Sequence, residues 1–297
     1  MRLIELPDAV SFLKSSSRIL LNSTESEAEN NLLLSSVMTL ARSSAMSSNR
    51  LSFLAVEKQG ETQLVALNVK DRRLTVSTGD VECAFYLGKK VAELQALNPS
   101  QMKIKGLFAP TPIGEAFARG WLIQSNLPQK LMQNQYAMKL DRKLASSNFE
   151  NASSLAREVH GLCRIALPKD QKLLSHWSRN FAKECNLDES TEESEEAIRR
   201  NLELRQLFIW EDRRPVAMAG FGGLTPKGAR VNMVYTDPAA RSKGYAKALV
   251  QNISLRILAQ ADRKFCFLFV ESTNRAAIKV YEELGYRKLG AFSDYLL

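Results

Sequence analysis

The chain has 297 residues, of which 45% are hydrophobic and 25% are charged, and its formal net charge is +9. This length allows two ordinary domains with buried cores, while no apolar run approaches the roughly 18 residues needed to span a bilayer. Lysine and arginine are scattered along the chain rather than interleaved with aromatic residues, so the positive charge alone does not predict a nucleic-acid surface.

The first residues contain no continuous apolar segment before a small-residue cleavage site, so we expect no secretory signal. The cysteines are far apart and fit neither a disulfide framework nor a zinc spacing. They are Cys83, Cys163, Cys185 and Cys266. We therefore expect a soluble, cytoplasmic protein that binds no metal and no membrane.

The N-terminal half starts with two helical patterns and continues with short apolar runs that are separated by turn residues. The expected helices cover 9–21 and 26–46, and three strands follow at 51–57, 63–68 and 74–77. A helix at 84–97, a strand at 103–107, a helix at 111–121 and a strand at 133–140 complete this half.

The C-terminal half shows the same order of patterns. We expect a strand at 161–166, helices at 169–185 and 193–204, and strands at 206–210, 215–221 and 229–236. A helix at 247–258, a buried strand at 264–270, a helix that starts near Arg275 and a closing strand or hairpin follow.

The repeated order predicts an α/β fold that is built from two similar units in tandem. The polar stretch at 145–154 is typical of a linker, so we expect an N-terminal domain at 1–145 and a C-terminal domain at 155–297. An unrelated α/β accessory domain is the alternative for the first half.

A short basic loop, Arg241-Ser-Lys-Gly-Tyr-Ala246, lies between the strand that ends at Thr236 and the helix that starts near Lys247. Free N–H groups at a helix N-terminus, together with the helix dipole, bind anions. Gly244 would let the backbone approach a bulky phosphate. The loop lacks the patterns of a P-loop and of a dinucleotide fingerprint, so we interpret it as a cradle for a pyrophosphate.

A second motif follows the buried strand at 264–270. Asn274 is followed at helical spacing by Ala277 and Tyr281, and Gly285-Tyr286 ends the run. Ser272 or Thr273 could cap this helix, and the glycine could end it in a left-handed conformation.

The loop Arg241–Ala246 resembles the acyl-CoA loop of the GCN5-related N-acetyltransferase (GNAT) superfamily, and the run 274–286 is similar to the fourth helix of that superfamily. The segments Val234–Ala246 and Tyr281–Leu289 resemble its FR47-like branch of two-domain predicted acetyltransferases. The resemblance is strong from about Leu207 to the end of the chain and faint before Pro168.

This resemblance implies an acyl-CoA N-acyltransferase fold in the C-terminal half and acetyl-CoA (coenzyme A) as the cofactor. It implies that the strand ending in Val234–Thr236 separates from the strand at 264–271, so that free backbone groups bind the pantetheine arm and an N–H near Val234 polarises the thioester. The residues expected to bind the cofactor are Val234, Tyr235, Thr236, Arg241, Ser242, Lys243, Gly244, Tyr245, Ala246 and Asn274.

Tyr281 is the expected general acid, although an aromatic residue at helical spacing can instead be part of the core. Asn274 either bonds the pantetheine or caps its helix. Many members of the superfamily carry a glutamate at the position of 229–232, where this chain has no carboxylate. Glu271 is the best substitute for the missing base; Glu211 and a water relay are the other options.

The resemblance implies transfer of an acetyl group to a primary amine of a small-molecule or peptide acceptor. The acidic run 188–196 could attract a cationic amine or could form a solvated helix face. A non-catalytic acyl-CoA sensor is the main rival function, and a nucleic-acid adaptor is a weaker one. The first half has acidic residues at 78–83, where the second half has its basic loop, so it should not bind acyl-CoA.

Overall fold

The computed structural model describes residues 1–42, 51–99, 102–145, 159–187 and 190–297. Its contacts divide the chain into two compact units. The N-terminal unit contains Met1–Ala137, Val270–Thr273 and Lys288–Leu297, and the C-terminal unit contains Met138–Phe269 and Asn274–Arg287. The linker predicted at 145–154 lies, apart from Ala145, outside the described residues. The division differs from the predicted domains in three respects: the first stretch of the N-terminal unit ends at Ala137 instead of 145, and both Val270–Thr273 and the end of the chain belong to that unit.

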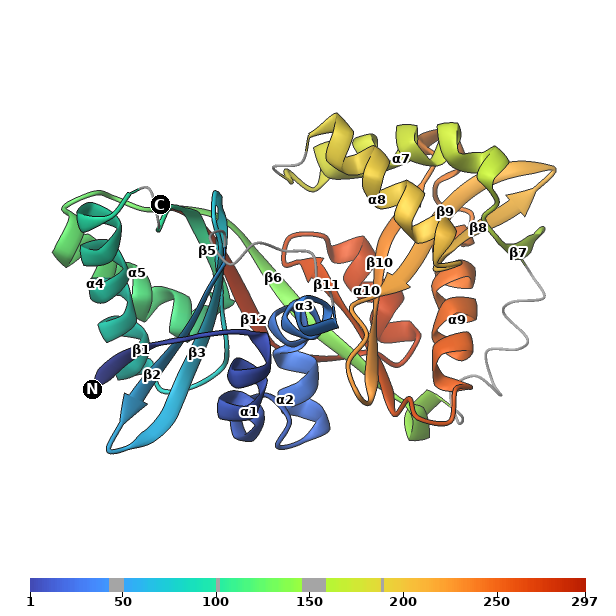
Figure 1. Cartoon of the computed structure of the whole chain (residues 1–297). Coiled ribbons are helices and arrows are strands. Elements are labelled where there is room, and N and C mark those ends of the chain that lie inside the picture. The colour runs from blue at the N-terminus through green and yellow to red at the C-terminus, as the bar shows by residue number, and fades with distance from the viewer. Residues whose placement is uncertain (43–50, 100–101, 146–158, 188–189) are drawn as a thin grey trace. The chain divides into compact units, whose positions relative to one another are not determined.

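The N-terminal unit begins with a strand that the sequence pattern did not predict. Its elements in chain order are β1 (Arg2–Leu6), α1 (Ala9–Leu20), α2 (Thr24–Glu29), α3 (Asn31–Arg42), β2 (Leu51–Lys58), β3 (Glu61–Val69), β4 (Arg72–Val76), α4 (Val81–Leu97), β5 (Ile104–Pro110), α5 (Thr111–Ser125) and β6 (Lys130–Asp141), whose last four residues lie in the other unit (Figure 1). Antiparallel pairing joins β1 to β2, β2 to β3 and β3 to β4, and β4 pairs in parallel with β5.

Side chains that alternate along the strands supply a core on each face of this sheet. Leu54 and Val56 of β2 pack with α4 and α5, whereas the intervening Phe53 and Ala55 pack with α1 and α3. The helix expected at 26–46 is in fact two helices, because α2 ends at Glu29 and α3 starts at Asn31. Residues 43–46 of that expected helix lie outside the described residues.

The C-terminal unit has the order strand, two helices, three strands, helix, strand, helix, which is that of the first unit except that three helices follow the first strand there. Its elements are β7 (Leu162–Ile165), α7 (Gln171–Glu184), α8 (Thr191–Glu203), β8 (Leu207–Asp212), β9 (Arg214–Gly222), β10 (Gly228–Thr236), α9 (Tyr245–Leu258), β11 (Phe265–Glu271) and α10 (Arg275–Glu283). As in the first unit, four strands pair antiparallel and the fourth, β10, pairs in parallel with the next strand, β11. The repeat that the sequence predicted is confirmed.

Helices cover both faces of the C-terminal sheet. Leu207 and Ile209 of β8, with Met218 of β9, pack against α7 and α8. On the opposite face Phe208 lies 5.5 Å beneath the guanidinium of Arg256, which is a residue of α9.

The final strand, β12 (Arg287–Leu296), is a single strand rather than a hairpin, and it pairs antiparallel with β5 from Phe292 opposite Pro110 to Leu296 opposite Gly106. It therefore contributes to the sheet of the N-terminal unit. Among the described residues, no helix has the length and apolar character needed to cross a membrane.

Candidate functional site

β10 carries a bulge close to its end. Asn232 stands opposite Gly220 and Tyr235 stands opposite Met218, so Met233 and Val234 together face the single residue between those two. Met233 has φ +52°. A bulge of this kind disrupts the hydrogen-bond ladder locally and leaves an extra residue unpaired.

The same strand separates from β11. Their parallel register runs from Gly228 opposite Phe265 to Arg230 opposite Phe267 and ends well before β10 ends at Thr236. The separation expected for this pair of strands is present, and the bulge at Met233 and Val234 lies beyond the last paired position.

The basic loop leads directly into α9. Gly244 is the N-cap of this helix, has φ +81° and is followed by a first turn that no side chain caps. A Cβ atom at Gly244 would lie 3.2 Å from Cγ2 of Val159, in addition to the strain of a left-handed conformation. The N–H groups of the first turn are thus available to an anion, as the cradle interpretation requires.

Two tyrosines, one on β10 before the loop and one within the loop, have side chains that contact other parts of the protein. Tyr235 is buried, and its ring lies 6.1 Å from that of Trp177 on α7. The hydroxyl of Tyr245 donates a 2.5 Å hydrogen bond to the carboxylate of Asp212, which raises the pKa of that tyrosine. Both side chains are engaged within the protein, so the backbone of these two residues is the part that would contact a ligand.

The loop arginine is already engaged. Arg241 Nη2 lies 2.7 and 2.9 Å from the two carboxylate oxygens of Glu184, at the end of α7, and its Nε donates to the carbonyl of Thr236 at 3.1 Å. Hydrogen bonding to Glu184 raises the pKa of Arg241. Ser242, with φ +64°, and Lys243 are exposed between this arginine and the glycine. The pair with Glu184 was not predicted, since the two residues are distant in sequence.

Asn274, rather than Ser272 or Thr273, caps α10. Its Oδ1 accepts a 3.0 Å hydrogen bond from the N–H of Ala277. The helix ends as expected at Gly285, which has φ +88°. The hydrogen bonds from Gly285 N to Glu282 O and from Tyr286 N to Tyr281 O, both 2.9 Å, form the usual glycine C-terminal motif. The capping role of Asn274 accounts for its oxygen, and its role toward a cofactor stays a prediction.

Tyr281 is 7% exposed, and its ring lies 5.9 Å from that of Tyr286. Burial, together with the neighbouring Cys185 thiol, raises the pKa of Tyr281 well above its usual range. Because Cys185 directly follows Glu184, the partner of Arg241, the end of α7 connects Tyr281 with the basic loop. The hydroxyl is protonated at neutral pH, as a proton donor must be.

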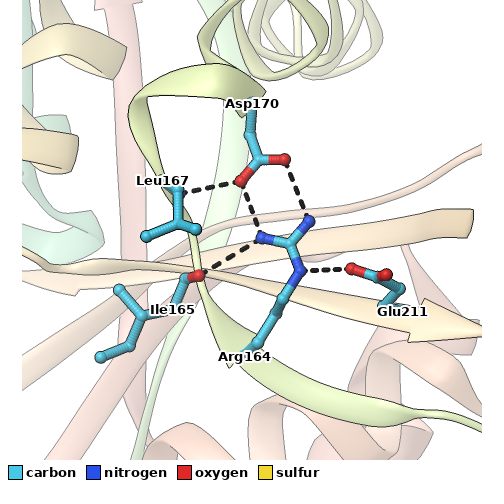
Figure 2. Close-up of polar contacts among 5 residues, drawn as sticks. All are labelled: Arg164, Ile165, Leu167, Asp170 and Glu211. Carbon is cyan, nitrogen blue, oxygen red and sulfur yellow. Dashed lines mark hydrogen bonds and ion pairs between the residues drawn. The ribbon is translucent and has the colours of Figure 1, made fainter.

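The two carboxylates considered as bases have different surroundings. Glu271, at the end of β11, is half-buried and belongs to the N-terminal unit, not to the unit that holds the loop. Glu211 pairs with Nε of Arg164, whose other two nitrogens contact Asp170 at 2.7 and 3.0 Å (Figure 2). Asp170 also accepts the N–H of Leu167 at 2.8 Å. This network fastens β7 and the start of α7 to β8, and it commits Glu211 to an ion pair.

The equivalent position of the N-terminal unit is filled by a side chain of the protein. Asp80 caps α4 by accepting the N–H of Cys83 at 2.9 Å, and Lys58 Nζ lies 3.0 Å from its carboxylate. The helix start that would face a pyrophosphate therefore carries its own anion. This geometry agrees with the expectation that the first unit does not bind acyl-CoA.

Comparisons with known proteins agree with this geometry. The profile of the acetyltransferase (GNAT) family matches residues 171–286. An acetyltransferase of the GNAT family from Colwellia psychrerythraea shares the fold over 100% of both chains, with a TM-score of 0.55 and 12% identity. A Drosophila protein matches with a TM-score of 0.62 and 13% identity, over 99% of this chain and 98% of its own.

A tandem GNAT protein from the clavulanic acid biosynthesis pathway matches with a TM-score of 0.56 and 12% identity, over 100% of this chain and 98% of its own. No curated protein sequence matches the chain. The uncapped loop and helix described above lie inside the segment that the family profile covers, and the two-unit architecture is that of tandem GNAT structures. Residues 171–286 of this chain therefore form a segment that matches the acetyltransferase (GNAT) family.

Proposed function

We propose that the protein is an acetyl-CoA-dependent N-acetyltransferase whose catalytic unit is the C-terminal one. The observation that carries the proposal is the uncapped start of α9 at Gly244, placed directly after a strand that bulges and leaves its neighbour. An anion site beside exposed backbone groups suits a ligand with a pyrophosphate at one end and an amide-containing arm. The family match makes acetyl-CoA the ligand of choice. The motifs at Val234–Ala246 and Tyr281–Leu289 support placement in the FR47-like branch.

The residues present fit this cofactor. The N–H groups at the start of α9, with Lys243, would bind the pyrophosphate, and backbone groups of Val234–Thr236 would bind the pantetheine arm. Acetyl-CoA would supply an acyl group activated as a thioester. When an amine takes that group, the nitrogen loses a proton and the departing sulfur gains one, and the buried hydroxyl of Tyr281 is our candidate for the second proton.

The proton on the amine has no assigned acceptor. Arg230 and Asn232 occupy the stretch in which many members of the superfamily carry a glutamate, and Glu211 is held by Arg164. Glu271 remains the proposed base, with a water relay as the other route. The lack of a carboxylate in the stretch 229–232 also favours the second candidate function, an acyl-CoA sensor that binds the cofactor without turning it over.

Calorimetric titration of acetyl-CoA into the wild type and into Gly244→Asp tests the proposed cofactor site. The aspartate adds negative charge where the pyrophosphate should lie, so one-site binding to the wild type should be lost in the variant. Gly60→Asp is the matched control, because Gly60 has the same φ of +81° and has no atom within 4 Å of a built Cβ. This control carries the same backbone strain and charge away from the loop.

Binding that survives Gly244→Asp would remove the proposed cradle. A folded wild type that binds no acetyl-CoA would remove the acyltransferase and the sensor together. Release of free thiol in the presence of an amine then distinguishes an enzyme, which shows turnover, from a sensor, which shows binding alone.

A further inference from the structure

Arg230, the third residue of β10, is a cation without a partner among the residues that the structure describes. Across the part of the chain that the structure describes, no hydrogen bond or ion pair joins its guanidinium to another residue. Burial alone lowers the pKa of Arg230 to about 10, and no carboxylate opposes that effect. The group stays charged at neutral pH. Because a partly buried charge without a partner is unfavourable, such a group is a strong site for an anion.

A second unsatisfied polar group lies two residues further along the same strand. The Oδ1 atom of Asn232 is buried and accepts no hydrogen bond from any residue that the structure describes. Residues i and i+2 of a strand share a face, so Arg230 and Asn232 stand side by side. Their partners on β9 are Gly222 and Gly220, which have no side chains.

The two glycines leave the room that the Asn232 side chain uses. A Cβ atom at Gly220 would come within 3.0 Å of Asn232 Oδ1, and one at Gly222 would lie 3.6 Å from Asn232 Nδ2. Met218, two residues before Gly220 on β9, packs in the cluster with α7 and α8, so this is the face of the sheet that those helices cover.

The position of the pair relates it to the proposed chemistry. Arg230 is the last residue of β10 in register with β11, and Asn232 directly precedes the bulge. If the cofactor's pyrophosphate binds at Gly244 and its arm follows the separated strands, the reactive end comes to the point where the strands rejoin. An acceptor that approaches this point meets Arg230 and Asn232.

The acidic residues of α8 do not compensate for this positive charge. Glu195 pairs with Arg179 at 2.9 Å, and Glu196 pairs with Arg199 at 2.6 Å. Glu193 completes the capping box of the helix with Ser190. These three acids are thus engaged by residues of α7 and α8 and by the cap of α8. Residues 188–189 of the acidic run lie outside the described residues.

We propose that the acceptor is an amine that also carries an oxyanion, with Arg230 binding the oxyanion and the Asn232 amide oxygen accepting a hydrogen bond from the amine. This inference rests on the proposed function and names its substrate class. A planar guanidinium matches both carboxylate and phosphate oxygens. The shared chemistry is therefore a negatively charged oxygen group a few bonds from a primary amine, and Arg230 acts as a specificity residue.

Initial rates of thiol release from acetyl-CoA test this proposal with matched acceptors. Glycine, β-alanine and phosphoethanolamine carry the oxyanion, whereas methylamine, ethylamine and ethanolamine are their counterparts without it. At least one anionic acceptor should exceed its counterpart in kcat/KM by about 100-fold, the size typical of a charge-assisted contact. The carboxylate and phosphate arms identify which oxyanion fits.

Substitutions at position 230 test whether Arg230 causes the preference for anionic acceptors. Arg230→Met should lower kcat/KM for the preferred acceptor by about 100-fold, mainly through KM, and Arg230→Lys should restore part of it. Arg205→Met, at an exposed arginine of the same unit, is the control and should behave as the wild type. The Kd of acetyl-CoA, measured by calorimetry, should be unchanged in all three variants.

Equal rates for anionic and uncharged amines, or an unchanged KM in Arg230→Met, would overturn the proposal. If the wild type binds acetyl-CoA but turns over none of these acceptors, each anionic amine is titrated into the complex with coenzyme A. Binding that Arg230→Met abolishes supports the proposal, and absence of binding overturns it. In either case the cofactor titration reports separately on the proposed function.

Discussion

Arg241 and Glu184 form an ion pair between the basic loop and the end of α7, with Nη2 of the arginine 2.7 and 2.9 Å from the two carboxylate oxygens. The guanidinium also lies 5.6 Å from the centre of the Tyr235 ring. The arginine of the motif is thus used to hold the loop against the preceding strand and helix. The phosphate binding that we propose would then fall to the backbone of the helix start and to Lys243.

Glu184→Gln should tighten acetyl-CoA binding by about two- to fivefold, because it removes a negative charge beside the proposed phosphate site, and the gain should shrink at high salt. Both side chains of the pair are nearly half exposed, so stability should change little. Calorimetric titration at two salt concentrations measures the effect, with Glu203→Gln on α8 as the control. Weaker binding in Glu184→Gln would mean that the pair positions the loop for the ligand.

Tyr281→Phe should lower kcat by about 10- to 100-fold without weakening cofactor binding, because it removes the proposed proton donor. Tyr286→Phe is the matched control: its hydroxyl lies 2.7 Å from Ser254 Oγ and 3.2 Å from Cys266 Sγ. That substitution should reduce stability by about 1 kcal/mol and leave kcat unchanged. Equal turnover of the wild type and Tyr281→Phe would assign Tyr281 to the core alone.

Asp170→Asn should reduce the free energy of unfolding at pH 7 by about 2–4 kcal/mol, since it breaks the buried contacts with Arg164. Hydrogen bonding from Arg164 holds the pKa of Asp170 below its ordinary value. The stabilisation is therefore present above the pKa of the unfolded state, about 4, and is lost as the pH falls through the lower folded value.

Urea unfolding at several pH values between 7 and 2 checks both parts of this prediction. The variant should lose less stability than the wild type on acidification. Glu196→Gln, which removes an exposed pair with Arg199, should change stability by less than about 0.5 kcal/mol. A similar acid dependence in the wild type and in Asp170→Asn would show that other carboxylates dominate.

Gly244→Ala should destabilise the protein by about 1–2 kcal/mol, because an L-residue resists a positive φ and the new Cβ meets Val159 at 3.2 Å. Gly60→Ala has the same φ of +81° and open space around its Cβ. The difference between the two variants in chemical denaturation isolates the contact with Val159. No difference would mean that the loop shifts to accept the side chain.

Arg230→Met should raise the free energy of unfolding by about 1–2 kcal/mol, because it replaces a partly buried, unpaired charge by an apolar side chain of similar length. A variant that is more stable but binds the acceptor less well would show that Arg230 is retained for function. A destabilised Arg230→Met would indicate that the aliphatic stem or the charge has a structural role instead.

Local sequence patterns were sufficient to predict most of the helices and strands and the position of the basic loop. The helix at α9 and the strand at β10 were predicted because the apolar periods of 3.6 and 2 residues are strong there, and Gly244 was singled out in the loop before the helix because a glycine lets the backbone approach a phosphate. Edge strand β1 was missed, since Arg2–Leu6 is short and half exposed and so carries a weak pattern.

The sequence by itself determined the two-unit repeat, the uncapped basic loop and the position of Tyr281 on α10, because each depends on residues close together in the chain. Only the tertiary structure decided that β12 pairs with β5, that Glu184 holds Arg241, and that Arg230 has no partner within the described part of the chain. A charge within an apolar strand was the one signal for Arg230 in the sequence. Whether such a charge is neutralised depends on residues far away in the chain, which come together only when the sheet and its covering helices have packed.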